Sequence, residues 1–168
     1  MRRVLWVVGV VVVLLATVLI VGMLLPRQHT VTETRTVAGD PERVWAVITA
    51  VEDFPSWRGD VDRVEVLSER QGDKTWSEHS SSGPMTYRVT ESTPFHRWTV
   101  EIADEDLGFG GTWTWELVAR PPSTVITLTE QGEVHNPFLR FVSHFFMDEQ
   151  ETITRYLDAL ESRMAEGG

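Results

Sequence analysis

The hydrophobic pattern of the chain begins with one long apolar run, which covers residues 4–25 and contains Thr17 as its only polar side chain. The run follows Arg2 and Arg3, has no polar face, and is not repeated later in the chain. Because a helix rises about 1.5 Å per residue, these residues span roughly 33 Å, enough to cross a hydrocarbon core of about 30 Å. The run therefore predicts one N-terminal transmembrane helix.

A secretory signal peptide is the main alternative for this run. The apolar core of a signal peptide is usually about 7–15 residues long and ends in a small-x-small cleavage site. Residues 21–25 contain no convincing site of this kind, and we therefore favour a retained helix. Arg2 and Arg3 precede the run, whereas Arg27 is the first basic residue after it. The positive-inside bias thus predicts a single-pass cell-membrane protein with a cytoplasmic N-terminus and an extracytoplasmic domain.

The remaining pattern combines period-two strands with two short helices, the second at residues 53–57, and one long closing helix. Asp40 followed by Pro41 predicts the start of a short helix, and Asn136 followed by Pro137 predicts the start of a long one that ends near Met164. Alternation predicts strands at residues 30–37, 63–69, 75–80, 85–91, 97–103, 112–119 and 124–130. This order predicts an α+β fold, in which an antiparallel sheet of about seven strands curls around the long C-terminal helix.

The domain organisation and the composition limit the possible partners. We predict an anchor at residues 1–26, a short linker at residues 27–30 and one domain at residues 31–165. All 25 acidic residues but only 13 of the 15 basic ones follow the anchor, which disfavours nucleic acid and anionic lipid headgroups as direct partners. The chain lacks cysteine, its five histidines lack metal-ligand spacing, and no phosphate-binding glycine motif occurs. We therefore predict no metal and no cofactor, and leave the oligomeric state open.

Four sequence motifs carry a resemblance to a known superfamily. They are GDPERVW at residues 39–45 with FPSW at 54–57, GTWTWEL at 111–117, TVITLTEQGEV at 124–134 and NPFLRFVS at 136–143. These motifs resemble the SRPBCC superfamily, the START and birch-pollen-allergen type of helix-grip fold that is commonly filed under polyketide cyclase/dehydrase. The resemblance covers about residues 31–165 and implies a fold that holds apolar ligands. It specifies fold far better than chemistry, and the N-terminal anchor is an addition to it.

Strand alternation places a set of aromatic side chains on the concave face of the predicted sheet, where they face the long helix. These candidate ligand-binding residues are Trp76, Tyr87, Trp98, Trp113 and Trp115 from the sheet, with Phe141, Phe145 and Glu149 from the helix. Two interpretations remain open, because tryptophan most often belongs to a solid core, whereas ligand pockets are also mostly apolar. The resemblance favours a cavity.

Three polar residues are weak candidates for chemistry. Glu149 falls in the middle of the apolar stripe of the long helix, Glu78 is in phase with Trp76, and His96 follows a Pro-Phe pair near a strand start. We favour a membrane-anchored protein that binds a hydrophobic small molecule or lipid without catalysis. An enzyme of cyclase, dehydratase or hydrolase type would use Glu149 with Glu78 or His96 as acid and base. A ligand-free interaction module of the cell envelope is the third hypothesis.

Overall fold

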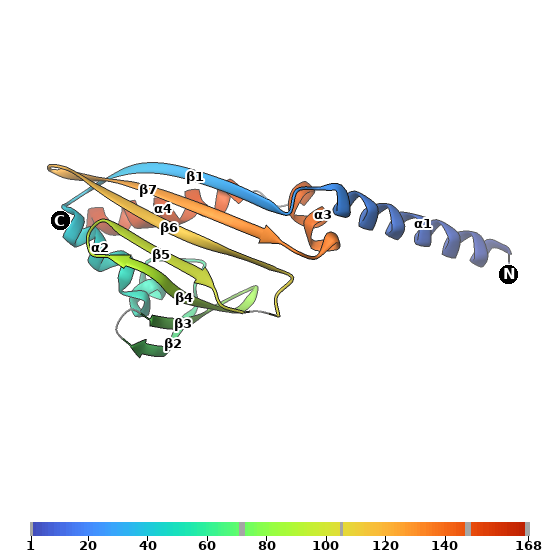
Figure 1. The fold of residues 1–168 in the computed structure, drawn as a ribbon, viewed down its shortest axis with the longest axis horizontal. Helices are drawn as coiled ribbons and strands as arrows, with labels where there is room; N and C mark the ends of the chain where they lie inside the picture. Colours follow the sequence, from blue (N-terminus) through green and yellow to red (C-terminus); the bar gives the residue numbers. More distant parts are fainter. Residues whose placement is uncertain (1, 71–72, 105, 147–148, 167–168) are drawn as a thin grey trace.

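A computed structural model describes residues 2–70, 73–104, 106–146 and 149–166. One helix projects from the rest of the molecule. This helix, α1 (Arg2–Leu24), extends along the long axis of the domain and away from it (Figure 1). Its most apolar 18-residue window has a mean hydropathy of 3.2 and contains no buried residue, so its length and composition suit a membrane span. A signal sequence meets the same criteria.

The domain is built on a seven-stranded antiparallel sheet with the strand order β1-β7-β6-β5-β4-β3-β2. Its strands are β1 (Gln28–Ala38), β2 (Arg63–Arg70), β3 (Asp73–Ser80), β4 (Gly83–Thr93), β5 (Arg97–Ile102), β6 (Phe109–Arg120) and β7 (Ser123–Val134). Six strands follow one another as a meander, and β1 closes the sheet by pairing along its whole length with β7. The predicted fold class is confirmed.

The sheet begins earlier than the sequence pattern predicts. Gln28 pairs with Glu133 and Thr30 with Gln131, so residues assigned to a linker already belong to β1. Only a few residues therefore separate α1 from the sheet, which leaves little slack between the apolar helix and the domain.

Two short helices follow β1 and cover one part of the sheet. The Asp40 side chain accepts a hydrogen bond of 2.8 Å from the Arg43 backbone N–H at the start of α2 (Pro41–Thr49), as the Asp-Pro signal predicts. The 3-10 helix η1 (Val51–Ser56) comes next, and its Phe54 is buried with Val44 and Ile48 of α2. These helices bring the segment after residue 56 over the sheet.

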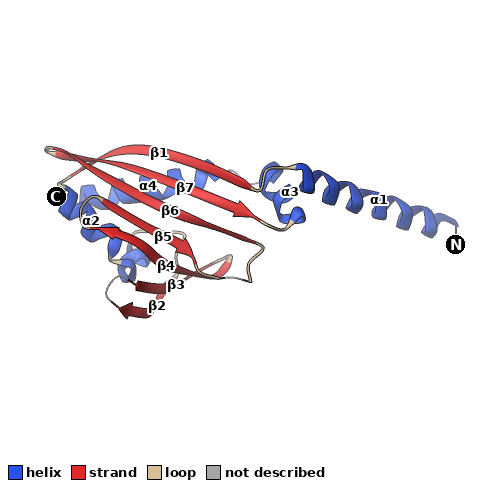
Figure 2. Cartoon of the chain, in the orientation of Figure 1, coloured by secondary structure: helices blue, strands red, loops and turns tan. Residues whose placement is uncertain are grey.

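The long C-terminal helix α4 (Glu149–Glu166) packs its apolar stripe on the concave face of the sheet. Figure 2 shows α2 and α4 behind the strands, where they form a second layer. The buried side chains of α4 recur at helical spacing and are Ile153, Tyr156, Leu157, Leu160 and Met164. They meet Trp98, Trp115 and Leu128 in one core.

The closing segment was predicted as one helix, and its described residues form the helices α3 (Pro137–Phe146) and α4, with residues 147–148 outside the described part of the chain. The first, α3, starts as predicted, because Asn136 Oδ1 accepts hydrogen bonds from the backbone N–H groups of Phe138 at 2.9 Å and Leu139 at 3.2 Å. However, α3 packs against the end of α1, where Phe145 is exposed and Phe141 is half-buried, although both were expected to face the sheet. The helical period identified an apolar face correctly but not the surface that this face contacts.

Candidate ligand site in the aromatic interior

Neighbouring strands bring the predicted aromatic side chains into contact on the concave face. Trp98 lies opposite Trp115 in the β5–β6 register, and Trp76 lies opposite Tyr87 in the β3–β4 register. The ring centroids are 4.8 Å apart for Trp98 and Trp115, 5.9 Å for Trp76 and Trp98, and 6.1 Å for Trp113 and Trp115. One connected aromatic layer therefore crosses four strands, and such ring pairs add to the free energy of burial.

The space that this layer encloses is small. It is a cavity of about 30 Å³ lined by Phe54, Arg58, Trp76, Glu78, Tyr87, Trp98, Val100, Trp113, Trp115 and Tyr156. A single water occupies about 30 Å³ in the liquid, whereas pockets for small molecules measure about 300–1,000 Å³. The interior is thus almost solid in this structure, and a ligand larger than a water requires side chains to move.

Two polar atoms on the cavity wall lack partners. The Tyr156 hydroxyl and the Trp115 indole N–H are both buried, and neither has a hydrogen bond of good geometry within the described part of the chain, although the Trp115 N–H is near enough to the Tyr156 oxygen to lower the pKa of Tyr156 against the effect of burial. The two rings themselves touch, with centroids 5.6 Å apart. Leaving a buried donor or acceptor unpaired costs about 1–3 kcal/mol, so a polar atom that entered this cavity would recover part of that free energy.

A partly buried ion-pair cluster, in which Glu78 is buried and Asp60 is exposed, forms one end of the cavity. The Arg58 guanidinium contacts Glu78 Oε2 at 3.1 Å and Asp60 Oδ2 at 2.6 Å, and it lies 5.0 Å from the Phe54 ring centroid and 5.2 Å from that of Tyr156. Trp76 Nε1 donates a hydrogen bond of 3.0 Å to Glu78 Oε1. Both oxygens of Glu78 are thus held from two sides, although only 7% of this residue is exposed.

Two carboxylates, those of Glu78 and Asp60, pair with the one guanidinium of Arg58, and their pKa values shift in opposite directions. Burial raises the pKa of Glu78 above its ordinary value, and Asp60 adds to this rise, while Arg58 opposes it. Burial alone would also raise the pKa of Asp60, but its hydrogen bond and charge pairing with Arg58 lower it overall. Glu78 is therefore the member of the cluster that takes a proton most readily.

The tyrosine hydroxyls of the cavity remain protonated donors. Burial raises the pKa of Tyr156 well above its ordinary value, and the charge of Glu78 raises it further. The same two causes, in the same order, raise the pKa of Tyr87. Tyr87 already donates a hydrogen bond of 3.1 Å to Met85 Sδ, whereas Tyr156 has no such acceptor within the described residues. Tyr156 is thus the tyrosine hydroxyl of the cavity whose proton has no acceptor within the described residues.

An open cleft lies on the outer side of this cluster. It has a volume of about 410 Å³ and is lined by Arg58, Gly59, Asp60, Val61, Glu78, Ser80, Ser81, Ser82, Met85, Tyr87 and Arg155. Arg58, Glu78 and Tyr87 border both spaces, so these three side chains form the wall between the cleft and the cavity. Movement of this wall would join the two spaces.

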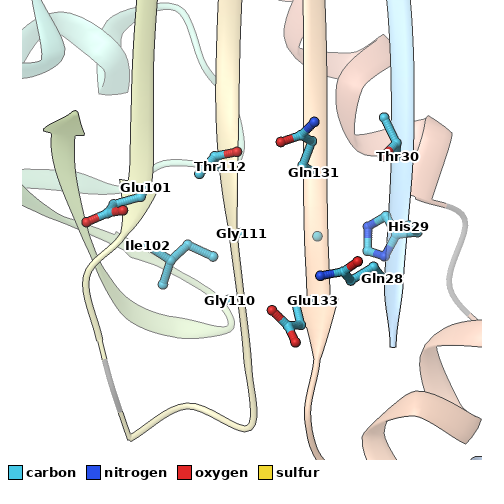
Figure 3. Close-up of a pocket in the computed structure, with 11 residues that line it drawn as sticks. Gln28, His29, Thr30, Glu101, Ile102, Gly110, Gly111, Thr112, Gln131 and Glu133 are labelled. Atoms are coloured by element: carbon cyan, nitrogen blue, oxygen red, sulfur yellow. The ribbon is translucent and has the colours of Figure 1, made fainter. Parts of the chain in front are cut away.

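A second hollow of about 420 Å³ lies over β1, β7, β6 and β5, and its lining is mainly polar. Figure 3 shows the side chains of Gln28, Glu101, Thr112, Gln131 and Glu133 around it, with Gly110 and Gly111 at its floor. It lacks the aromatic walls that an apolar ligand needs. We therefore place the candidate site in the interior and not in this hollow.

The structure brings together only part of the predicted site. Trp76, Tyr87, Trp98, Trp113, Trp115 and Glu78 all line the cavity. Phe141 and Phe145 belong to α3, beside α1, and do not line it. His96 is exposed at the β4–β5 turn and does not line the cavity, and the side chain of Glu149 lies outside the described part of the chain. The predicted pairing of Glu149 with Glu78 or His96 is therefore not tested by the described residues.

Sequence reasoning missed four residues of the cavity wall, which are Phe54, Arg58, Val100 and Tyr156. Arg58 directly follows the FPSW motif, and Tyr156 lies on the apolar stripe of the closing helix. The available signals were weak ones: an arginine next to an aromatic turn, and a tyrosine at a core position, which needs a partner for its hydroxyl.

The sheet, the gripped helix and the aromatic interior between them define a START-type helix-grip protein. The chain belongs to the family described as polyketide cyclase / dehydrase and lipid transport, which it matches over residues 28–165. No curated protein matches its sequence.

Solved structures of the same fold include enzymes and a protein named only by its superfamily. The aromatase/cyclase ZhuI from Streptomyces sp. R1128 has a TM-score of 0.68 and 17% identity, covering 82% of this chain and 94% of its own. A START superfamily protein from Mycobacterium smegmatis has a TM-score of 0.66 and 17% identity, covering 83% and 99%. Norcoclaurine synthase from Thalictrum flavum has a TM-score of 0.67 and 15% identity, covering 83% and 96%. At these identities the similarity concerns the fold alone.

Proposed function

We propose that this protein binds a hydrophobic small molecule or lipid in its aromatic interior, without catalysis, while α1 holds it at a membrane. The observation that carries the proposal is the cavity wall, where an aromatic layer surrounds an unpaired hydroxyl and an unpaired indole N–H. Neither group has a hydrogen bond of good geometry within the described part of the chain, and one oxygen atom of a ligand could accept from both.

The geometry favours a ligand with a flat apolar body and a hydroxyl or carbonyl oxygen. The stacked rings of Trp76, Trp98 and Trp115 offer parallel or tilted faces to such a body. Its oxygen would meet the Trp115 N–H and the Tyr156 hydroxyl. The cleft of about 410 Å³ gives access, and the Arg58–Glu78 wall must open to admit the ligand.

The role of α1 as a membrane anchor is part of the same proposal. Its apolar length suits a span, and the arginines before it favour a cytoplasmic N-terminus and an extracytoplasmic domain. The close packing of Gly22 against Pro137 supports a retained helix over a removable signal, because cleavage would strip α3 of this contact.

Binding is tested on the full chain in lipid nanodiscs by titration with 2-naphthol, followed by tryptophan emission. We expect saturable quenching, and Tyr156→Phe should weaken affinity about tenfold because one hydrogen bond is lost. Tyr87→Phe is the matched control, since its hydroxyl already has a partner, and its affinity should change less than about twofold. No saturable quenching, together with no small molecule in organic extracts of the purified protein, would contradict binding and favour the ligand-free module.

Acid–base catalysis is a second candidate, favoured by the raised pKa of the buried Glu78 at the cavity wall. Mass spectrometry of molecules extracted from the wild type and from Glu78→Gln separates the two functions. A binding protein carries the same molecule in both forms. An enzyme would retain substrate only in the variant, and the extracted masses would then differ.

A further inference from the structure

The helix α3 has the opposite orientation to an ordinary surface helix. Its exposed residues include Phe145 and Phe146, which are 55% and 77% exposed, and Phe138 lies on the same side. Arg140, on the other side, is only 4% exposed. A helix on a water-soluble domain buries its apolar stripe and exposes its charges. The exposed stripe of α3 therefore requires a cover that the described part of the chain does not supply.

Arg140 fastens this helix to the end of α1. Its guanidinium donates hydrogen bonds to the backbone carbonyls of Gly22 at 2.9 Å, Leu25 at 3.3 Å, Val134 at 3.0 Å and His135 at 3.1 Å. Gly22 packs so closely on Pro137 that a methyl group there would overlap the Pro137 carbonyl. One side chain thus joins α1, the end of β7 and α3, and Figure 1 shows α3 beside the end of α1.

We propose that α3 is an interfacial membrane helix, whose phenylalanine face enters the leaflet at which α1 leaves the bilayer. A membrane is the occupant that we infer, because α3 exposes its phenylalanines and packs against the end of the exposed apolar helix α1. Charge agrees, since α3 contains no acidic residue although the domain is strongly acidic. Interfacial helices of this kind bury their apolar face about 5–10 Å below the headgroups. The proposal rests on the proposed role of α1 as an anchor.

This arrangement would fix the orientation of the domain relative to the bilayer. Two membrane contacts, one spanning and one interfacial, are joined by Arg140 and by very few linking residues. The domain is therefore held at a set angle to the bilayer and does not swing on a flexible tether.

The test uses nitroxide labels on the full chain in phosphatidylcholine vesicles, which is direct because the chain has no cysteine. Power-saturation EPR compares the access of oxygen with that of a polar nickel chelate at Phe146→Cys, with Phe138→Cys as a second site. Both labels are expected about 5–10 Å below the headgroups. His144→Cys is the matched control, because it is exposed on the opposite side of the same helix and should remain at the aqueous boundary.

Two further labels separate the failure of this proposal from the failure of the anchor. Val13→Cys reports on the middle of α1, and Val118→Cys reports on an exposed apolar site of the sheet that should stay in water. If Val13 lies in lipid and Phe146 is reached by the nickel chelate, the interfacial role of α3 is overturned and the anchor stands. If Val13 is also in water, the anchor itself is wrong. Protection of Phe146 from both reagents would identify a protein cover, which also overturns the proposal.

Discussion

The helices α3 and α4 follow one another in the chain and both are amphipathic, yet their apolar stripes have opposite environments. The apolar stripe of α4 is buried on the sheet at Ile153, Leu157 and Leu160, whereas the stripe of α3 is open to its surroundings at Phe145 and Phe146. The polar side of α4 faces water, while that of α3 holds the buried Arg140. Amphipathicity therefore predicts that a helix has an apolar face but does not identify what covers that face.

The largest expected difference between the two helices is in their contribution to folding. Leu160→Ala in α4 should lower the free energy of unfolding by about 2–5 kcal/mol, because it leaves a cavity in a fully buried core. Phe146→Ala in α3 should change it by less than about 0.5 kcal/mol in detergent micelles, since the side chain is mostly exposed. Chemical denaturation measures both. Equal losses would mean that Phe146 packs into the domain and would remove the contrast.

The next effect concerns the inward side of α3. Arg140→Gln should lower the free energy of unfolding by about 2–3 kcal/mol, because several backbone carbonyls lose a charged donor. It should also increase the mobility of a nitroxide at residue 146. Arg155→Gln in α4 is the matched control and should cost less than about 0.5 kcal/mol, since its ion pair with Glu151 is exposed. If Arg140→Gln left the free energy of unfolding unchanged, other contacts would hold α3 in place.

A smaller effect should appear as pH dependence of the interior that α4 closes. The pKa of Glu78 is raised in the folded state, so the folded protein retains a proton that the unfolded chain has released. The free energy of unfolding should therefore fall as pH rises from the ordinary value of 4.5 through the raised pKa. Asp60, whose pKa is lowered, loses its stabilising effect only at lower pH.

Denaturation of Glu78→Gln between about pH 5 and about pH 8 measures this contribution. The variant should show a flatter profile than the wild type. Glu65→Gln, an exposed carboxylate on the neighbouring β2, is the control and should retain the wild-type profile. A wild-type slope of opposite sign would mean that Arg58 outweighs burial at Glu78.

The smallest effect distinguishes the two tyrosines of the interior. Tyr156→Phe removes an unpaired hydroxyl and should leave the free energy of unfolding unchanged or raise it by up to about 1 kcal/mol. Tyr87→Phe loses a bond to the Met85 sulfur and should lower it by a similar or smaller amount. Thermal denaturation of ligand-free protein measures both signs. A large loss at Tyr156→Phe would mean that its hydroxyl has a partner in solution.

Much of the fold followed from local patterns. The Asp40 and Asn136 caps form as predicted because capping depends on residues only two or three positions apart. Trp113 and Trp115 share the concave face because side chains alternate along any strand. The candidate site was less predictable, since the contact between Arg58 and Glu78 joins a turn to a strand, and no local period encodes it.

By itself, the sequence determined that this chain has one apolar helix, a curled antiparallel sheet with an aromatic concave face, and a family membership that spans the whole domain. Only the tertiary structure decided that the interior is nearly solid, that Arg58 serves two carboxylates, and that Arg140 holds carbonyls more than a hundred residues away. The physical reason is the separation in sequence between the residues that determine each feature. Strand alternation, helical period and caps depend on neighbours in the chain, whereas cavity volume, ion pairing and the cover of an apolar face depend on residues that meet only after folding.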